Sequence, residues 1–386
     1  MRIALVAGEA SGDLLGAGLI RAIREKFPAA EFQGVAGPAM VAAGCKRLAD
    51  SESLAVMGLI EPLTEIPRFL RLRRGLIQRW RAAPPDVFVG IDAPDFNLGL
   101  EKALRKSGIR TVHYVSPSIW AWRAGRIKKI RKAADRVLCI LPFEKKIYDE
   151  QGIDAVFVGH PKADNLATDV DAESARRILD LDGRVVVAVL PGSRKSEVSR
   201  LGPIFTAAAA ILARADDQIR FVTPVASPGL RPMIEEQIAA AGMQDLFKLI
   251  DGDSIEAMSA AHVVLLASGT AALESALLCK PTIAAYRVAE ITARILQIFG
   301  LIKAPYFTLP NLLTEEPLVP ELIQWAVTPS AVAEAVLALL RDPARQAAIA
   351  GRFAKLRSEL ALDADRRAAD AVIDLATRNQ LLHSTP

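Results

Sequence analysis

Short apolar runs alternate with helix-length segments along most of the chain, and this alternation limits the fold more than any other feature of the sequence. The expected strands cover residues 2–8, 86–92, 110–116, 136–141, 155–160, 184–192, 219–225, 246–252, 262–268 and 282–286. The expected helices cover residues 13–26, 61–82, 95–107, 123–134, 203–215, 229–241 and 270–279. Uninterrupted apolar runs are typical of strands that are buried on both faces. The pattern therefore predicts an α/β fold with parallel sheets covered by helices.

The pattern restarts halfway along the chain, which indicates two Rossmann-like domains. Residues 2–16 and 184–198 both show a strand, a turn that contains glycine and the start of a helix. The stretch 161–174 is polar and lacks periodicity, so we predict a linker there. Residues 330–380 are rich in Ala, Leu and Arg and predict helices only. The expected parts are a first domain at 1–164, a second at 165–340 and C-terminal helices at 341–386.

Charge and cysteine usage exclude several classes of protein. The 386 residues carry a formal net charge of +4, which is too small a surplus to indicate nucleic-acid binding by itself. Three cysteines and four histidines lack the spacings of a disulfide framework or a zinc site. The N-terminus is not a secretory signal, and no apolar run approaches the roughly 20 residues of a membrane span. We therefore expect a cytosolic protein, which leaves contact with a membrane surface open.

The first strand runs into the turn GEASGDLLG at residues 8–16. The turn matches neither GxGxxG nor the Walker A pattern, which counts against nicotinamide and P-loop enzymes. Its small residues still allow a ligand to approach the backbone at a helix N-terminus. The alternative is a tight turn in which Ser11 or Asp13 caps the helix.

Two turns in the second half of the chain predict anion binding more directly. In LPGSRKSEV (190–198), Ser193 and Arg194 can contact phosphate oxygens, although Ser193 with Glu197 is also close to capping-box spacing. In ASGTAALESALL (267–278), Thr270 and Glu274 share one helix face, although an acidic first turn alone would explain this. Together the two turns favour a site for a nucleotide diphosphate.

Two aspartates stand where a buried strand ends, in VGIDAPDFN at residues 89–97. Ligands of open α/β sheets bind at the carboxyl ends of the strands. One carboxylate of Asp92 and Asp95 could act as a general base, and the other could orient it or cap a helix. The alternative for Asp95 is that it only N-caps the following helix.

Two basic clusters lie in the first half of the chain. Residues 68–81 carry six arginines among Phe, Leu, Ile and Trp, and residues 120–132 follow two tryptophans with further Arg and Lys. Arginine next to Trp and Leu suits an interfacial helix on anionic lipid, whereas the alternative is a solvated helix face. Nucleic acid is not expected, since no base-stacking module accompanies the charge. The membrane-facing candidates are Met57, Leu59, Ile60, Phe69, Leu70, Arg71, Arg73 and Arg74.

Nine short motifs between the N-terminus and about residue 315 point to one family in combination. They are GEASGD (8–13), AVMGLIE (55–61), PDVFVGIDAPDFN (85–97), HYVSPSIWAWR (113–123), LPFE (141–144), FVGHP (157–161), LPGSR (190–194), LLASGTAALE (265–274) and LPNLL (309–313). Together they resemble the lipid-A-disaccharide synthase family. No single motif is specific, but the combination is.

The resemblance implies an inverting glycosyltransferase whose two Rossmann-like domains face each other across a cleft, the GT-B architecture. It implies transfer from UDP-2,3-diacylglucosamine to 2,3-diacylglucosamine 1-phosphate, which gives a β(1→6) disaccharide 1-phosphate and UDP in lipid A synthesis. It further implies work at the inner face of the inner membrane of Gram-negative bacteria, without a metal or another cofactor. The family's C-terminal helices swap between the subunits of a homodimer, which would suit the helical segment of this chain. The alternative for this segment is that it packs back on the N-terminal domain.

The resemblance also implies roles for particular residues. Asp95 matches the general base. The donor-binding candidates are Ser193, Arg194, Gly269, Thr270, Glu274 and Asn311. The acceptor-side candidates are Glu9, Ser11, Gly12 and His113. Two alternatives stay open: a UDP-N-acetylglucosamine 2-epimerase on the same fold, and a non-catalytic protein that binds nucleotide-sugar or lipid. The arginine- and tryptophan-rich patch and IDAPDFN favour the transferase.

Overall fold

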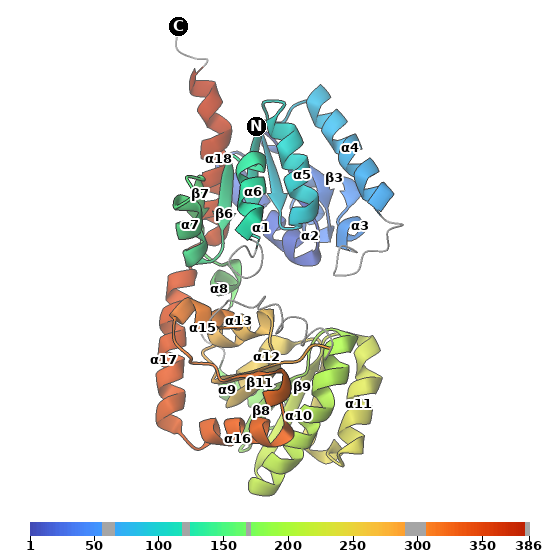
Figure 1. Cartoon of the computed structure of the whole chain (residues 1–386), viewed down its shortest axis with the longest axis vertical. Coiled ribbons are helices and arrows are strands. Elements are labelled where there is room, and N and C mark those ends of the chain that lie inside the picture. The colour runs from blue at the N-terminus through green and yellow to red at the C-terminus, as the bar shows by residue number, and fades with distance from the viewer. Residues whose placement is uncertain (56–65, 118–123, 167–170, 290–305, 383–386) are drawn as a thin grey trace. The chain divides into compact units, whose positions relative to one another are not determined.

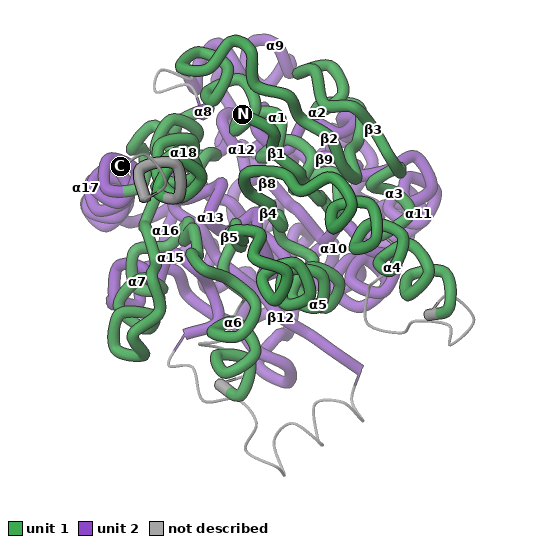
Figure 2. Tube along the Cα trace, turned by 90° about the horizontal axis from the view of Figure 1, so that it is seen from above, with its two compact units in different colours: residues 1–164, 360–386 green, residues 165–359 purple. Residues whose placement is uncertain are grey.

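The computed structural model describes residues 1–386 except 56–65, 118–123, 167–170, 290–305 and 383–386 (Figure 1). The chain divides into two units, which Figure 2 distinguishes by colour. Unit 1 consists of residues 1–164 together with 360–386, and unit 2 consists of residues 165–359. Unit 1 is therefore built from both ends of the chain, whereas unit 2 is continuous in sequence.

Unit 1 contains a seven-stranded sheet in the order β3-β2-β1-β4-β5-β6-β7, and every pairing is parallel. The strands are β1 (Arg2–Ala7), β2 (Glu31–Ala36), β3 (Cys45–Asp50), β4 (Val87–Ile91), β5 (Arg110–Tyr114), β6 (Arg136–Cys139) and β7 (Ala155–Phe157). The chain first builds outward from β1 to β3 and then returns to the other side of β1 with β4. The reversal between β1 and β4 is the topological switch point, where ligands of such sheets bind.

Helices cover both faces of this sheet. They are α1 (Ala10–Lys26), α2 (Pro38–Ala42), α3 (Glu52–Ala55), α4 (Ile66–Ala82), α5 (Pro94–Arg105), η1 (Ala124–Arg126), α6 (Ile127–Ala133), α7 (Pro142–Asp149), α8 (Pro161–Asn165) and α18 (Ala364–Leu382). Alternate residues of β1 show why the strand is apolar after Arg2. Ile3 and Leu5 belong to the core formed with α1 and α18, whereas Ala4 and Val6 belong to the core formed with α4 and α5.

Unit 2 has the same architecture as unit 1. Its six-stranded sheet has the order β10-β9-β8-β11-β12-β13 and is again parallel throughout. The strands are β8 (Val185–Leu190), β9 (Ile219–Val225), β10 (Phe247–Asp251), β11 (Val263–Ala267), β12 (Thr282–Tyr286) and β13 (Glu321–Ile323). The helices are α9 (Ala172–Ile178), α10 (Lys195–Ala215), η2 (Pro228–Leu230), α11 (Arg231–Ala240), η3 (Gln244–Leu246), α12 (Ser254–Ala260), α13 (Thr270–Leu277), α15 (Leu309–Thr314), η4 (Gln324–Ala326), α16 (Pro329–Leu340) and α17 (Pro343–Leu360). Here the switch point lies between β8 and β11.

The predicted fold class is confirmed, because both sheets are parallel, both are covered by helices and the C-terminal stretch is helical. Some local predictions were wrong. The break between the two units falls inside the stretch 161–174, after Asp164, but α8 lies within this predicted linker and α9 begins in it. Helix α10 begins eight residues earlier than the predicted 203, and Pro203 lies inside it.

By length and composition, α10 is also the one helix among the described residues that could cross a membrane. Half of the apolar stretch that meets this test is buried inside the unit. Val198, Leu201 and Phe205 of α10 belong to the core of unit 2. The burial is that of a core helix in a folded domain.

Unit 1 is completed where the chain returns from unit 2. The N–H of His160 donates to the carbonyl of Leu360 at 2.8 Å. The carboxylate of Asp164 accepts the N–H groups of Asp363 and Ala364 at 2.9 and 2.7 Å, and so caps the N-terminus of α18. In this single chain α18 then packs against α1. A swap of these helices between two chains stays a prediction.

Candidate active site

The turn between β4 and α5 carries the two aspartates. Asp92 and Ala93 both adopt left-handed backbone conformations, with φ of 51° and 43°. Pro94 then opens α5, so that Ala93 is the N-cap and Asp95 is the second residue of the helix. Asp95 therefore does not N-cap α5, contrary to the alternative drawn from the sequence. Consecutive non-glycine residues in this region are strained, and such strain is typical of functional sites.

The turn after β1 lies directly against the turn after β4. A Cβ atom on Gly8 would lie 2.4 Å from the Cβ of Ala93, so this close approach requires glycine. The Nδ2 group of Asn97 donates to the carbonyls of Val6, Ile91 and Asp92, at 3.3, 3.3 and 2.8 Å. Asn97, which the sequence analysis did not single out, thereby ties the carboxyl ends of β1 and β4 together.

The acceptor-side candidates from the first turn occupy different environments. Glu9 and Ser11 are exposed at the start of α1, while Gly12 is buried. Asp13 is buried and accepts N–H groups of Gly37, Ala39 and Met40, at 2.8, 2.8 and 3.1 Å. Asp13 therefore caps α2 and not the helix in which it stands, which corrects the sequence-based alternative for this residue.

Asp95 is the most exposed carboxylate of this turn, and it forms an ion pair. Its side chain is 67% exposed, whereas the partner Arg126 is 15% exposed. The Nη2 atom of Arg126 donates to both carboxylate oxygens, at 2.8 and 2.9 Å. Arg126 ends η1, immediately before α6, and α6 packs against α5. The predicted base is thus held by a guanidinium that the sequence analysis did not identify.

His113 does not reach this surface. It stands inside β5, and its Nδ1 atom lies 2.7 Å from Oε1 of Glu101, with both side chains fully buried. A Cβ atom on Gly90 would lie 2.3 Å from the same Oε1 atom, so the strand leaves room for the carboxyl group. Burial raises the pKa of Glu101, while His113 acts in the opposite direction. The geometry therefore gives His113 a structural contact with Glu101 and no access to an acceptor.

Unit 2 contains a cavity of about 450 Å³ at the carboxyl ends of β8, β9, β10 and β11. It lies at the switch point of the sheet, between the N-termini of α10 and α13. Its lining includes five of the six donor-binding candidates: Ser193, Arg194, Gly269, Thr270 and Glu274. The structure thus brings together the two turns that the sequence singled out as anion-binding.

Glu197 occupies part of the anion-binding turn. Its Oε2 atom accepts the N–H groups of Ser193 and Arg194, at 3.0 and 3.3 Å, and its Oε1 atom lies 3.0 Å from Nη1 of Arg194. The N-cap of α10 is Arg194, so the capping arrangement lies one residue later than the predicted Ser193. The Arg194 side chain is 73% exposed, which leaves it able to turn toward a ligand.

Asn311, the sixth donor-binding candidate, is absent from the lining of the cavity and is 1% exposed. Its Nδ2 group donates to the carbonyl of Val319 and to Oε1 of Glu321, at 2.8 and 2.9 Å, and its Oδ1 atom accepts the N–H of Val319. In this structure the side chain joins α15 to the start of β13. The geometry therefore does not support direct contact between Asn311 and the donor.

The membrane-facing candidates from the sequence also lie in different environments. Met57, Leu59 and Ile60 lie outside the described residues. Phe69 is 6% exposed and packs with Leu76 and Trp80 in the core under α4, so its assignment to the surface was wrong. Its helix turns the apolar face inward, as amphipathic helices on a sheet do. The remaining candidates are the partly buried Leu70 and Arg73 and the exposed Arg71 and Arg74.

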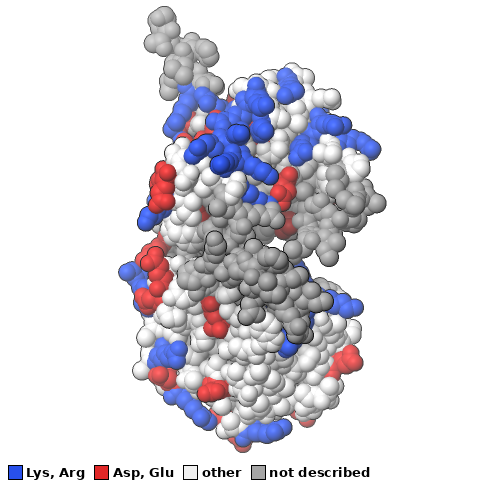
Figure 3. Space-filling model, in the orientation of Figure 1, with Lys and Arg blue, Asp and Glu red and all other residues white. Residues whose placement is uncertain are grey.

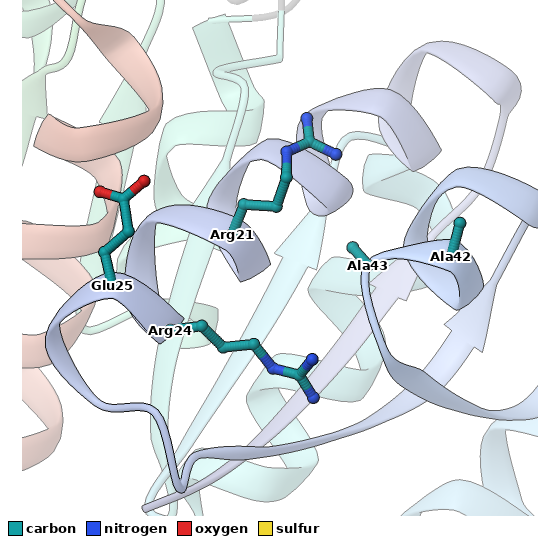
Figure 4. Close-up of a pocket in the computed structure, with 5 residues that line it drawn as sticks. All are labelled: Arg21, Arg24, Glu25, Ala42 and Ala43. Atoms are coloured by element: carbon teal, nitrogen blue, oxygen red, sulfur yellow. The ribbon is translucent and has the colours of Figure 1, made fainter.

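Besides the cavity of unit 2, there is a hollow of about 570 Å³ in unit 1, beside α1 and α2 (Figure 4). Arg21, Arg24 and Glu25 line it from the last turns of α1. The guanidinium of Arg24 lies 5.5 Å from the centre of the Phe32 ring and donates to the carbonyl of Gly44. The hollow stands at the amino end of the strands, opposite the edge where such sheets bind ligands. The contacts with Phe32 and Gly44 account for Arg24.

The two parallel-sheet units and the cavity of unit 2 define the class as the two-Rossmann, or GT-B, fold. A structure of Anabaena Alr3699/HepE in complex with UDP matches with a TM-score of 0.60 and 13% identity, over 97% of this chain and 100% of that one. UDP-GlcNAc 2-epimerase from Neisseria meningitidis, bound to UDP-GlcNAc, matches with a TM-score of 0.60 and 14% identity, over 98% of this chain and 100% of that one. At such low identity the likeness shows the fold alone.

Sequence comparisons assign the family. The family model for lipid-A-disaccharide synthetase matches residues 3–372. The lipid-A-disaccharide synthase of Xanthomonas campestris pv. campestris is 48% identical over 382 residues, which is 98% of this chain and 87% of that protein. The synthase of Azotobacter vinelandii is 48% identical over 380 residues, 98% of this chain and 99% of that protein. The chain belongs to the lipid-A-disaccharide synthetase family.

This assignment makes the protein a UDP-sugar glycosyltransferase of lipid A disaccharide synthesis. It confirms the resemblance drawn from the nine motifs. It does not favour the epimerase alternative, which shares the fold but not the sequence family.

Proposed function

We propose that the enzyme joins UDP-2,3-diacylglucosamine to the 6-hydroxyl of 2,3-diacylglucosamine 1-phosphate with inversion, and that Asp95 is the general base. The observation that carries the proposal is the strained turn at the switch point of unit 1, which presents an exposed carboxylate from the first turn of α5. Inversion requires a single displacement at the anomeric carbon. A primary hydroxyl is a weak nucleophile, and a carboxylate within hydrogen-bond reach assists by taking its proton.

The cavity of unit 2 is the proposed site for the UDP part of the donor. When the bond to the sugar breaks, negative charge develops on the diphosphate. Arg194 and the N-termini of α10 and α13 would stabilise that charge without a metal ion. Glu197 would then give up its contacts with the Ser193 and Arg194 amides to the phosphate oxygens. Glu274, one turn into α13, would accept a hydrogen bond from the ribose.

One assay tests the reaction itself. UDP release is measured from the acylated donor with and without the acylated acceptor. Release that depends on the acceptor, together with a disaccharide product, supports the transferase. A 2-epimer as product would instead indicate an isomerase, and the absence of both products would indicate a binding protein.

Replacing Arg194 by alanine is expected to weaken UDP binding by about 10- to 10²-fold, because a charge-assisted contact to the diphosphate is lost. Isothermal calorimetry with UDP measures the change. Arg200→Ala is the matched control, because Arg200 stands on the same helix and donates to the carbonyl of Ser196, away from the cavity lining. UDP affinity in Arg194→Ala equal to that of the wild type would contradict the donor role of Arg194.

We further propose that unit 1 binds the anionic surface of the inner membrane from the cytoplasmic side. Figure 3 shows Lys and Arg gathered over α4, α5 and α6. The exposed members include Arg71 and Arg74 of α4 and, on α6, Lys128, Lys129, Arg131 and Lys132. Helices α4 and α6 both pack against α5, so the two basic clusters belong to neighbouring helices of the same unit. Acylated substrates reside in membranes, and such a surface would hold the enzyme next to them.

Replacing Arg71, Arg73 and Arg74 by glutamine is expected to lower binding to anionic vesicles by about 10²-fold, since each basic residue near such a surface contributes about 1 kcal/mol. Sedimentation with vesicles that contain anionic lipid measures the change, and neutral vesicles provide the baseline. A triple variant of exposed arginines in unit 2, at Arg214, Arg341 and Arg345, is the matched control. An equal loss in the control variant would show that net charge, and not this surface, causes binding.

A further inference from the structure

The ion pair between Arg126 and Asp95 occupies the carboxylate that the proposed mechanism needs. Both oxygens of Asp95 accept hydrogen bonds from Nη2 of Arg126, at 2.8 and 2.9 Å. The side chain of Arg126 is largely buried, whereas that of Asp95 is exposed. Most exposed ion pairs contribute little to stability. This pair lies at the strained turn after β4, where the sheet has its switch point. We therefore look for a functional role of the pair beyond stability.

Each oxygen of a paired carboxylate keeps a further lone pair, so the acceptor hydroxyl competes with Arg126 for Asp95 and is not excluded by it. A different partner for Arg126 would leave the carboxylate to the hydroxyl alone. A phosphate group is the strongest competitor, because it carries a charge of about −1.5 to −2 at neutral pH and matches the forked geometry of a guanidinium. The proposed acceptor carries such a group on C1.

The chemistry of the acceptor places its phosphate near the hydroxyl that reacts. C1 and C5, which bears the C6 hydroxymethyl group, both flank the ring oxygen of the same sugar. An acceptor whose 6-hydroxyl contacts Asp95 therefore holds its phosphate about one ring width away. A guanidinium that now touches Asp95 would need only a change of its own side-chain conformation to reach a phosphate at that distance. Lys128 and Lys129, exposed on the first turn of α6, add positive charge to the same region.

We propose that Arg126 binds the 1-phosphate of the acceptor and that its move from Asp95 to the phosphate frees the base. This inference rests on the proposed function, in which Asp95 is the base. With the phosphate on Arg126, Asp95 takes the proton of the 6-hydroxyl. The bond from O6 to the anomeric carbon then forms, the bond from that carbon to the diphosphate breaks, and UDP leaves with the electron pair.

The arrangement couples the activity of the base to the presence of the correct acceptor. Without a phosphate at Arg126, Asp95 stays paired with the guanidinium and activates a water molecule more slowly. The donor is thereby protected from hydrolysis. An acceptor that lacks the phosphate is discriminated against at the chemical step as well as in binding.

The test compares the acylated acceptor with the same lipid lacking its 1-phosphate, in wild type and in Arg126→Gln. The wild type is expected to prefer the phosphorylated acceptor by about 10²-fold in kcat/KM, and Arg126→Gln to lose most of that preference. With the acceptor that lacks phosphate, Arg126→Gln is expected to turn over faster than the wild type, because its Asp95 is not engaged. Arg47→Gln, which removes an exposed pair with Asp50 in the same unit, is the matched control and keeps the wild-type preference.

A second arm supplies the phosphate separately from the acceptor. Inorganic phosphate, added to the wild type with the acceptor that lacks phosphate, is expected to raise turnover by occupying Arg126. The same addition to Arg126→Gln is expected to have no effect. Arg126→Lys, which keeps the charge without the fork, is expected to show an intermediate preference for the phosphorylated acceptor.

Failure of this inference differs from failure of the proposed function. An unchanged preference for the phosphorylated acceptor in Arg126→Gln, or no response of the wild type to inorganic phosphate, would overturn the role of Arg126. Both results leave acceptor-dependent UDP release intact. If the wild type released no UDP in response to either acceptor, the proposed function would itself be wrong.

Discussion

Replacing Asp95 by asparagine is expected to lower turnover by about 10² to 10⁴-fold while UDP affinity is unchanged. Asparagine has almost the same shape, so the turn after β4 and the first turn of α5 should keep their conformation. The amide cannot accept the proton of the attacking hydroxyl. Because the donor cavity lies in unit 2, and Asp95 in unit 1, binding of UDP should be unaffected. Steady-state turnover with both acylated substrates and calorimetry with UDP measure the two quantities.

Asp92→Asn is the matched control, because it removes the other carboxylate of the same turn. Asp92 has a φ of 51°, a left-handed conformation in which asparagine is among the most readily accommodated residues. Its backbone N–H donates to the carbonyl of Tyr114, which the substitution leaves in place. Asp92→Asn should therefore retain most of the turnover. Near-normal turnover in Asp95→Asn, or an equal loss in both variants, would exclude Asp95 as the specific base.

The second large effect concerns stability and not turnover. Replacing Asp13 by alanine is expected to lower the free energy of unfolding of unit 1 by about 3 kcal/mol, because two buried backbone N–H groups and one partly buried N–H group lose their acceptor. These groups belong to Gly37, Ala39 and Met40. For a unit of this size the unfolding midpoint should fall by roughly 6 to 12 °C. Scanning calorimetry is suitable, since it can separate the transitions of two units.

Ser11→Ala is the control for this variant. Ser11 lies two residues away on the exposed side of the same helix start. Its substitution should leave the midpoint within about 1 °C, because exposed positions without special contacts contribute little. A change of less than about 2 °C in Asp13→Ala would show that water or a shift of α2 replaces the carboxylate.

The sequence predicted the central strands well because their pattern follows from burial on both faces. Strands such as β1 and β4 carry no charged residue apart from the exposed Arg2 that opens β1, and such apolar runs are typical of a covered parallel sheet. Strands β2, β3 and β13 were missed. The edge strand β3 exposes Lys46 and Arg47, and β13 has only three residues, so neither shows an apolar run. Edge strands commonly carry such charges, which prevent further strand pairing.

The candidate site was predictable only where a residue with suitable chemistry directly follows the end of a strand in the sequence. Asp95 and the turns at Arg194 and Thr270 stand next to strand ends, so their place at the carboxyl edges follows from the fold. The pairing of Arg126 with Asp95 spans 31 positions and depends on the packing of α6 against α5. No local pattern predicts such a contact.

Motif membership did not separate residues that touch a ligand from residues that support the site. Asn311 and His113 both stand in motifs of the family, yet both are buried and hydrogen-bonded within their own units. Asn97 was not singled out, although it joins the ends of β1 and β4. A polar residue that is buried requires partners, and a motif does not reveal whether those partners are backbone groups or substrate.

The return of α18 to unit 1 has a consequence for the order of folding during synthesis. Its residues Ala364, Ala368, Val372 and Leu375 complete the apolar core on one face of the first sheet. The ribosome makes these residues only after the whole of unit 2. Unit 2 is continuous and can close its own core earlier, whereas unit 1 keeps part of one sheet face uncovered until the last helix emerges. The N-terminal half is therefore the last to finish folding and is the part that most needs protection from aggregation in the nascent chain.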